Sequence, residues 1–339
     1  MKAVTIGDVA KRAGVSKSTV SQYLNGRYEY MGVETRERIK KVIEELEYSP
    51  NKIARSLKQK KTTTIGVILA NILYGFNTKV VRAIEDVCNE KGYHVIICNA
   101  DDNPEKEKRY IEMLLSNQVD GIISMPTQSN NDLYRDLWKR NLPLVFIDRI
   151  LSDIQVSSLL LDNKKAAKIC VEELVSNGYE KIAIMTMAPT TISARWERLA
   201  GYKIGIEEHG LHFEENYVIA SPINEMQARL TKLLELPNRP ESIIATNDLI
   251  FMEILKYVRT NNMKIPEELA LIGIDDISFA DIFNPALTTV AQPAFDIGRE
   301  AAELLIEKIK QSDSNVGDVH RFEPKLIKRA SSTKSKLKT

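Results

Sequence analysis

The hydrophobic positions of this 339-residue chain change their spacing near residue 60. Between Thr5 and Tyr48 they recur three and four residues apart in three short blocks, which is the period of amphipathic helices. After Thr64, short apolar runs alternate with amphipathic helical stretches, a pattern typical of a parallel sheet with crossover helices. The pattern therefore predicts a small all-helical module followed by an α/β body.

The α/β body is predicted to form two lobes. Strands are expected at 65–70, 93–98, 121–124, 144–147, 157–161, 182–187, 242–245 and 269–273. Helices are expected at 78–91, 105–116, 163–177, 195–209, 228–236, 249–261 and 296–310. Because these elements exceed one comfortable domain, we expect two stacked lobes, each with a doubly wound parallel sheet. A ligand would then bind between the lobes, at the carboxyl ends of the strands.

The distribution of charge separates the same two parts. The whole chain is nearly neutral, with 47 Lys+Arg against 46 Asp+Glu. Residues 1–61 carry 14 basic and 7 acidic side chains, whereas the rest of the chain carries 33 and 39. A basic module on an acidic body indicates that one part binds a polyanion, although one short lysine-rich stretch can produce the same count.

The composition also excludes several classes of protein. The apolar runs fall short of the roughly 18 residues that a membrane span needs, and the N-terminus leads into a polar pattern, so no span or signal peptide is expected. Three cysteines without a C-x-x-C pair and four scattered histidines provide neither a disulfide framework nor a zinc site, which fits a reducing cytoplasm. The common phosphate-loop, dinucleotide, nucleophile-elbow and zincin motifs are absent, so we expect no catalysis, no cofactor and no metal.

The first two helical blocks have the spacing of a helix-turn-helix. Thr5 and Asp8 read as a capping box that begins the first helix, and Gly14 ends it in a position that tolerates a positive φ. Ser16 then caps a second helix at 17–25. A short turn of this kind sets the second helix to enter a major groove of DNA.

The outer face of this second helix would carry the residues that contact DNA. Lys17 can donate to guanine edges, and Gln22 can bond adenine in bidentate fashion. Short donors suited to phosphate oxygens are Ser16, Thr19 and Ser21, and Ser18 shares the outer face. Any small three-helix module exposes such residues, so the spacing by itself leaves a purely structural interpretation open.

The residues of this module resemble the headpiece of the LacI/GalR family of bacterial transcriptional regulators. The match runs through 5–21 and 24–26 and continues at 35–43, 45–46, 48–51 and 54–57. The α/β body is similar to the family's core, a twin-lobed relative of periplasmic sugar-binding proteins. We therefore expect a headpiece at 1–48, a hinge helix and linker at 49–61, and an effector-binding and dimerisation core at 62–339. The core would divide into an N-lobe, about 62–160 plus 292–321, and a C-lobe, about 161–291 plus 322–339.

One segment departs from the family pattern. The aromatic turn Arg27-Tyr-Glu-Tyr-Met-Gly32 replaces a simpler serine-containing turn, and Gly32 with Val33 stands where a serine N-cap is usual. This variant looks like a subgroup associated with the use of sugar acids, including ketogluconate. The departure affects which half-site sequence the headpiece would recognise. It leaves the expected way in which the headpiece docks on DNA unchanged.

The resemblance also gives a role to the segment after the headpiece. Asn51 can cap a helix of only two turns, and a helix that short is marginal in water. In a dimer on DNA, two such hinge helices can pack together and insert Leu57 between base steps of the minor groove, while Arg55 and Lys58 contact phosphates or groove edges. The alternative is an ordinary linker with a solvated lysine run. The predicted DNA-binding set is Thr5, Ser16, Lys17, Ser18, Thr19, Ser21, Gln22, Asn25, Asn51, Ala54, Arg55, Leu57 and Lys58.

The N-lobe offers two groups of side chains to the expected cleft. Phe76 and Asn77 follow the first core strand, and an aromatic face there can stack on a sugar ring. Tyr74 beside them can equally pack into the lobe. Asp148 and Arg149 follow the fourth strand and suit the binding of hydroxyls or a carboxylate, with a solvated turn as the alternative.

The C-lobe completes the predicted effector site. The segment 193–201 resembles the family segment whose arginine, three residues before the glycine, binds the ligand, and this arginine is Arg198. Arg195 lies on the same helical face, and two cations near one cleft favour an acidic ligand. Asn247 and Asp275 lie where family members bond sugar hydroxyls, although Asn247 can also cap the helix that it begins.

With the resemblance, these residues predict a cytoplasmic homodimer that represses transcription. It would bind a pseudo-palindromic operator in double-stranded DNA and be released by a sugar or sugar-acid effector, as most family members are, although some need a corepressor. The rival function is that of a sugar-binding transport protein, which would share the twin-lobed core and would have no use for residues 1–61.

Overall fold

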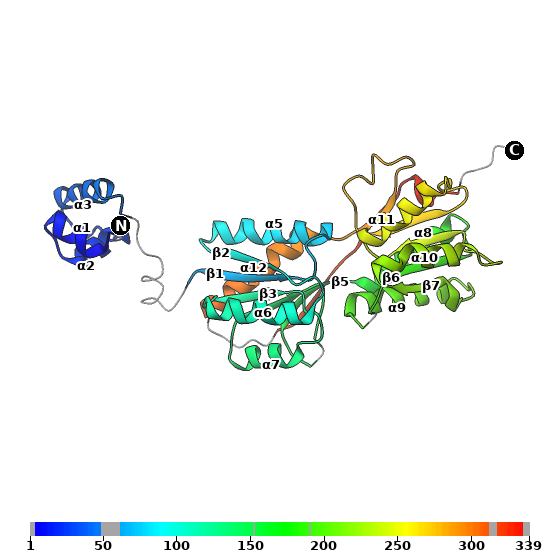
Figure 1. Cartoon of the computed structure of the whole chain (residues 1–339), viewed down its shortest axis with the longest axis horizontal. Helices are drawn as coiled ribbons and strands as arrows, with labels where there is room; N and C mark the ends of the chain where they lie inside the picture. Colours follow the sequence, from blue (N-terminus) through cyan, green and yellow to red (C-terminus); the bar gives the residue numbers. More distant parts are fainter. Residues whose placement is uncertain (1–3, 49–61, 152, 190, 312–316, 335–339) are drawn as a thin grey trace. The chain divides into compact units, whose positions relative to one another are not determined.

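The computed structural model describes residues 4–48, 62–151, 153–189, 191–311 and 317–334. The chain forms two compact units, Met1–Thr62 and Thr63–Thr339 (Figure 1). The first unit is all-helical and the second is α/β, so the predicted fold class is confirmed. Within the described ranges, no helix is both long and apolar enough to cross a lipid bilayer.

Three helices build the first unit: α1 (Ile6–Ala13), α2 (Lys17–Leu24) and α3 (Val33–Glu45). The predicted capping box is present, because the Asp8 N–H donates to Thr5 Oγ1 at 3.3 Å and the Thr5 N–H donates to Asp8 Oδ2 at 2.9 Å. Gly14 ends α1 with a φ of 66°, which glycine adopts at little cost. The apolar faces of the helices meet in a core of Val9, Ala10, Ala13, Val20, Ile39 and Val42.

The second unit contains two six-stranded sheets, one in each lobe. The N-lobe sheet has the order β11-β5-β4-β3-β1-β2 with parallel pairing throughout, and the C-lobe sheet has the order β12-β10-β9-β8-β6-β7 with β12 antiparallel. The strands are β1 (Thr64–Leu69), β2 (His94–Asn99), β3 (Gly121–Ser124), β4 (Leu144–Ile147), β5 (Ser157–Leu161), β6 (Ile182–Met187), β7 (Val218–Ser221), β8 (Ser242–Ala245), β9 (Ala270–Ile274), β10 (Thr288–Ala291), β11 (Val319–Phe322) and β12 (Lys325–Ile327).

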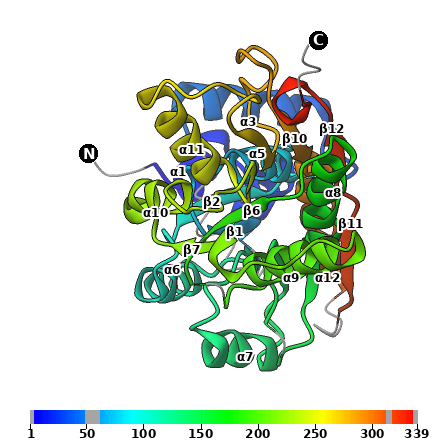
Figure 2. The same ribbon diagram turned by 90° about the vertical axis from the view of Figure 1, so that its right-hand side faces the viewer.

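Helices cover both faces of each sheet. They are α5 (Gly75–Glu90), α6 (Pro104–Ser116), α7 (Asn131–Lys139), α8 (Asn163–Ser176), α9 (Ser193–Glu208), α10 (Met226–Leu234), α11 (Asp248–Thr260) and α12 (Ala294–Gln311). In the N-lobe, α5 and α12 pack on one face of the sheet, and α6 and α7 pack on the other. In the C-lobe, α8 and α9 cover one face, and α10 and α11 cover the other (Figure 2).

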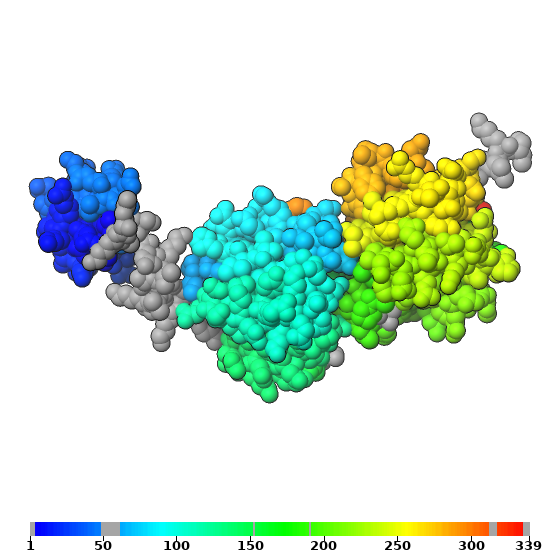
Figure 3. Space-filling view, viewed as in Figure 1, coloured from blue at the N-terminus to red at the C-terminus, as the bar shows by residue number. Residues whose placement is uncertain are grey.

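The chain passes between the lobes three times. It crosses from β5 to α8, from β10 to α12, and from β11 to β12. Each lobe is therefore built from segments that are far apart in the sequence. The two lobes of this unit contact each other where the unit is narrowest, which we call the waist (Figure 3).

All eight predicted strands are present, five of them with the predicted ends. The prediction missed four strands (β7, β10, β11, β12) and one helix (α7). Three of the missed strands lie at sheet edges and are partly or largely exposed, and the longest apolar run among them is Val218–Ala220 of β7. The fourth, β10, is buried but begins with Thr288 and Thr289, which an apolar pattern does not detect.

Candidate functional sites

The predicted DNA-reading residues lie along one side of α2. Lys17 and Ser18 are exposed, Ser21 and Gln22 are half-buried, and Val20 on the opposite side is fully buried. Spacings of one, four and five residues place these four polar side chains on one helical face. That face is free of the headpiece core and is available for contact with a DNA groove.

Three of the predicted DNA contacts, Thr5, Ser16 and Asn25, also act as helix caps. Ser16 Oγ accepts from the Thr19 N–H at 3.1 Å, and it lies 2.7 Å from Ser18 Oγ. The Thr5 hydroxyl donates to Asp8 Oδ2 at 2.7 Å. The Asn25 amide donates to the Ser21 carbonyl at 2.6 Å and so closes the end of α2. Each of these side chains already forms a hydrogen bond within the headpiece. Their contacts with DNA stay predictions.

The aromatic turn between α2 and α3 is held by stacking. The Tyr28 ring lies edge-on to Tyr23 at 5.8 Å and beneath the Arg36 guanidinium at 4.4 Å. Tyr30 is 88% exposed. The departure from the family pattern therefore adds one stacked and one solvent-facing tyrosine beside α2, the predicted DNA-reading helix.

The predicted hinge contacts, Asn51, Ala54, Arg55, Leu57 and Lys58, lie outside the described residues. Their roles stay predictions from the sequence.

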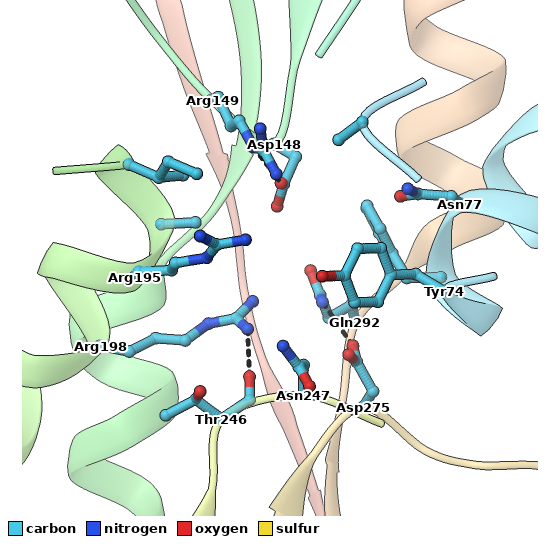
Figure 4. Close-up of a pocket in the computed structure, with 14 residues that line it drawn as sticks. Tyr74, Asn77, Asp148, Arg149, Arg195, Arg198, Thr246, Asn247, Asp275 and Gln292 are labelled. Atoms are coloured by element: carbon cyan, nitrogen blue, oxygen red, sulfur yellow. Dashed lines mark hydrogen bonds and ion pairs between the residues drawn. The ribbon is translucent and has the colours of Figure 1, made fainter. Parts of the chain in front are cut away.

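A cavity between the lobes of the second unit brings all eight predicted effector residues together (Figure 4). Its lining consists of Ala70, Tyr74, Phe76, Asn77, Asp148, Arg149, Ile192, Ala194, Arg195, Arg198, Thr246, Asn247, Asp275 and Gln292. The cavity has about 50 Å³ of space for the centres of water-sized spheres, which is room for several water molecules.

Two aspartates occupy matching positions in the two lobes. Asp148 follows β4 and Asp275 follows β9, and their backbones have left-handed φ values of 65° and 92°. Each N–H donates at 3.0 Å to a carbonyl of the neighbouring strand, Leu159 for Asp148 and Val290 for Asp275. Such backbone conformations are costly for residues other than glycine and cluster at ligand sites. Both carboxylates lie at the strand ends, as the sequence predicts.

A carboxylate that the sequence reasoning missed joins two of the arginines. Asp102 Oδ1 lies 2.7 Å from Arg149 Nη1 in the same lobe, and Asp102 Oδ2 lies 2.9 Å from Arg195 Nη2 in the opposite lobe. Arg149 is 3% exposed, so its charge requires this partner. Asp148 Oδ2 lies farther away, at 3.5 Å from Arg149 Nε.

Arg198 is positioned by close packing of α9 on α8. A Cβ at Gly201 would overlap the carbonyl oxygen of Lys164, so only glycine permits this approach. Arg198 Nε then donates to Asn163 Oδ1 at 2.7 Å, and its Nη1 donates to the carbonyl of Thr246. Among the described residues, Arg198 Nη2 has no hydrogen-bond partner, which leaves it available to a ligand.

The buried Asp275 and the half-buried Gln292 form a polar pair on the opposite wall. Burial raises the pKa of Asp275 to about 7. The Gln292 amide donates to Asp275 Oδ1 at 2.5 Å, while Gln292 Oε1 is buried without a partner within the described residues. A buried acceptor of this kind is costly unless a donor reaches it, so ligand hydroxyls are suitable partners.

Four lining or supporting residues with polar side-chain groups, Tyr74, Asp102, Thr246 and Gln292, were missed or left open by the sequence reasoning. Tyr74 does line the cavity, and its hydroxyl donates to Met187 Sδ in the other lobe at 3.2 Å. Thr246 directly follows β8, so the strand-end rule that selected Asp148 could have found it, whereas Asp102 comes three residues after β2 in a turn of left-handed residues. Gln292 follows β10, a strand that was not predicted.

The lining is suited to recognising a polyhydroxylated molecule. It combines two aromatic rings with amides, carboxylates and guanidinium groups, the usual mixture in sugar-binding pockets. The three arginines face the carboxylates of Asp102, Asp148 and Asp275, so the site is less cationic than Arg195 and Arg198 alone suggest. In the part of the chain that the structure describes, no group of three His, Cys, Asp or Glu side chains could hold a metal ion.

Comparisons with known proteins agree with this arrangement. Residues 5–51 match the family described as "Bacterial regulatory proteins, lacI family", and residues 171–332 match the "Periplasmic binding protein-like domain". The "Probable HTH-type transcriptional regulator EndR" of Paenibacillus polymyxa is 45% identical over 332 residues, which cover 96% of this chain and 98% of that protein. The "HTH-type transcriptional regulator KdgR" of Bacillus subtilis (strain 168) is 34% identical over 330 residues, which cover 96% of this chain and 97% of that protein.

The fold is also that of a solved repressor. The lac repressor dimer bound to operator and the anti-inducer ONPF superimposes with a TM-score of 0.83 at 22% identity, and the match covers 98% of this chain and 100% of that chain. At this identity the likeness concerns the fold, a helical headpiece followed by a two-lobed core. The two relatives that match over nearly the full length are both described as HTH-type transcriptional regulators.

Proposed function

The chain belongs to the LacI family of bacterial regulatory proteins, and we propose that it represses genes of carbohydrate or sugar-acid catabolism until a small-molecule effector releases it from its operator. One observation carries the proposal: eight predicted contacts, drawn from both lobes, meet at a single cavity. A chain with a DNA-reading module and a ligand-reading module has the two parts that an effector-controlled repressor requires.

On the DNA side, a homodimer places two copies of α2 in successive major grooves of a pseudo-palindromic operator. The exposed face of α2 and the basic excess of residues 1–61 support this role. The lac repressor of the same fold is described as a dimer bound to operator. We place the protein in the cytoplasm, where its DNA lies and where the free thiols of Cys88, Cys98 and Cys170 are kept reduced.

On the effector side, each wall of the cavity has a chemical task. Tyr74 and Phe76 offer ring faces to a sugar, and Asn247 and Asp275 accept or donate hydrogen bonds to its hydroxyls. Arg198 Nη2 is placed to bind a carboxylate or a further hydroxyl. Because Asp102 and Asp148 together offset two of the three arginine charges, the site suits a neutral sugar or a singly charged sugar acid better than a multiply charged ligand.

Release follows from the coupling of two sites. A ligand that enters the cavity replaces contacts between the lobes and thereby changes their relative orientation. The two headpieces of a dimer are then no longer spaced for successive grooves, and operator affinity falls by the coupling factor.

The test measures DNA binding and effector response in one variant pair. Operator duplexes are selected from a pseudo-palindromic library, and a thermal-shift screen of neutral sugars, sugar acids and phosphosugars identifies the effector. Arg198→Ala should bind the operator normally and lose its response to the effector, whereas Arg259→Ala, an exposed arginine on α11, should behave as wild type. Full release of the Arg198→Ala variant would contradict the effector site.

The same assay separates the rival function. Binding of a repressor to its operator weakens steeply with salt because lysine and arginine displace counterions from phosphates. Absence of salt-dependent binding to every selected duplex would favour a sugar-binding receptor without a DNA function.

A further inference from the structure

The first turn of α5 in the N-lobe is completed by a residue from the C-lobe. Tyr74 stands at the N-cap of this helix, and its hydroxyl is directed to Met187 rather than to the helix's own amides. The N–H of Gly75, at the first helical position, donates to Asp248 Oδ2 at 2.6 Å. A cap is ordinarily supplied by a Ser, Thr, Asp or Asn side chain of the same segment.

The Asp248 carboxylate is not needed to cap its own helix. Asn247 already caps α11, since its Oδ1 accepts from the Ile250 N–H at 2.9 Å. Asp248 Oδ1 accepts from the Leu249 N–H at 2.8 Å, and Oδ2 is directed to the other lobe. One carboxylate thus lies between the positive ends of two helices from opposite lobes, and it is 8% exposed.

Gly75 is fitted to this approach. A Cβ at this position would lie 3.3 Å from Asp248 Oδ2, closer than such atoms normally come. One helical turn farther along α5, Lys79 Nζ donates to the Asp276 carbonyl at 3.2 Å, which adds a second bond between the same two surfaces. In Figure 3 the cyan surface of α5 meets the yellow surface of α11 at the waist between the lobes.

We propose that Asp248 is a latch that closes the two lobes by capping α5 across the cleft. The latch lies one residue from effector contacts on both sides, because Phe76 follows Gly75 and Asn247 precedes Asp248. It is therefore a positioning residue for the cavity, and separation of the lobes leaves the first turn of α5 uncapped. Its effect on effector binding rests on the proposed function, whereas the latch itself is measured without any ligand.

The experiment is hydrogen exchange of the full-length protein followed by mass spectrometry. In Asp248→Ala, the amides at 75–78 in the N-lobe should exchange about fivefold faster, the factor that a typical N-cap provides. The matched control is Glu253→Ala, which removes a carboxylate from the same helix whose partner, Gln227, lies in its own lobe. This control should leave exchange at 75–78 unchanged.

A second variant tests the same contact from the side of α5. Helix propensity alone predicts that Gly75→Ala slows exchange in the first turn of α5. The latch predicts that Gly75→Ala slows exchange less in the wild-type background than in the Asp248→Ala background, because the new Cβ crowds Asp248 Oδ2 only where that carboxylate is present.

Three results would overturn the latch. They are unchanged exchange at 75–78 in Asp248→Ala, an equal acceleration throughout the N-lobe including β1, and an equal effect of Gly75→Ala in the wild-type and Asp248→Ala backgrounds. None of them depends on the effector, so a failed effector screen contradicts the proposed function and leaves the latch standing.

Discussion

Asp102→Asn should destabilise the core through a single lost counter-charge. The asparagine retains the side-chain shape and tolerates the left-handed backbone, but it has one acceptor oxygen for two guanidinium groups, and its amide nitrogen would face one of them. Removing one partner of a buried ion pair costs about 3–5 kcal/mol. Because Asp148 still lies 3.5 Å from Arg149 Nε and the Asp102 side chain is 22% exposed, we expect a loss of about 2–3 kcal/mol.

The neighbouring residue provides the control. Asp101 has the same φ of 53° and also bonds a cation, Lys106, but this pair lies at the surface. Surface pairs contribute little to stability, so Asp101→Asn should unfold close to wild type. The measurement is urea unfolding of both variants followed by circular dichroism. Equal losses in the two variants, or no loss in Asp102→Asn, would refute the view that the bridge between Arg149 and Arg195 holds the core together.

The remaining predictions concern the acid in the cavity and the hinge. Burial raises the pKa of Asp275 from 3.8 to about 7, so between these pH values the folded protein holds a proton that the unfolded chain has released. Stability should therefore fall as the pH rises from about 4 to about 7 and then level off. Asp275→Asn, which mimics the neutral acid, should lose this dependence. If the melting temperatures of the wild type and this variant change in parallel from about pH 5 to about pH 8, the reasoning is contradicted. At the hinge, Leu57→Ala should weaken operator binding and DNA bending while effector affinity stays nearly intact, as a wedge between base steps requires. Unchanged affinity and bending would exclude the wedge.

The fold was predictable wherever burial on both faces forces an apolar run. β3, β4, β5, β6 and β8 lie inside their sheets and were predicted with their exact ends. An edge strand such as β11, with the sequence Val319-His-Arg-Phe322, is half solvated and shows no such run. An edge strand is held mainly by its backbone hydrogen bonds, and the spacing of apolar side chains does not reveal these bonds.

The candidate site was predictable to the extent that it lies at strand ends. Asp148 and Asp275 follow strands with clear apolar signals, and the family motif ending at Gly201 indicated Arg198. Asp102 was missed because its direction is set by two successive left-handed residues, Asp101 and Asp102, after β2. A turn of that kind cannot be inferred from side-chain types that also suit an ordinary solvated loop.

Three charged side chains from one turn of α9 link the cavity to the chain crossings. They are Arg195, Glu197 and Arg198. Arg195 bonds Asp102 of the opposite lobe, and Glu197 forms a bidentate pair with Arg321 of β11 at 2.7 and 2.9 Å. Arg198 bonds Asn163, the first residue of α8 after the crossing from β5. Lobes that are joined by three chain segments can reorient only by bending at those segments. As proposed, the ligand binds Arg198 and therefore acts directly on α9. This helix already forms hydrogen bonds with residues next to two of the three crossings, so a change in its position reaches the crossings without an intermediate loop.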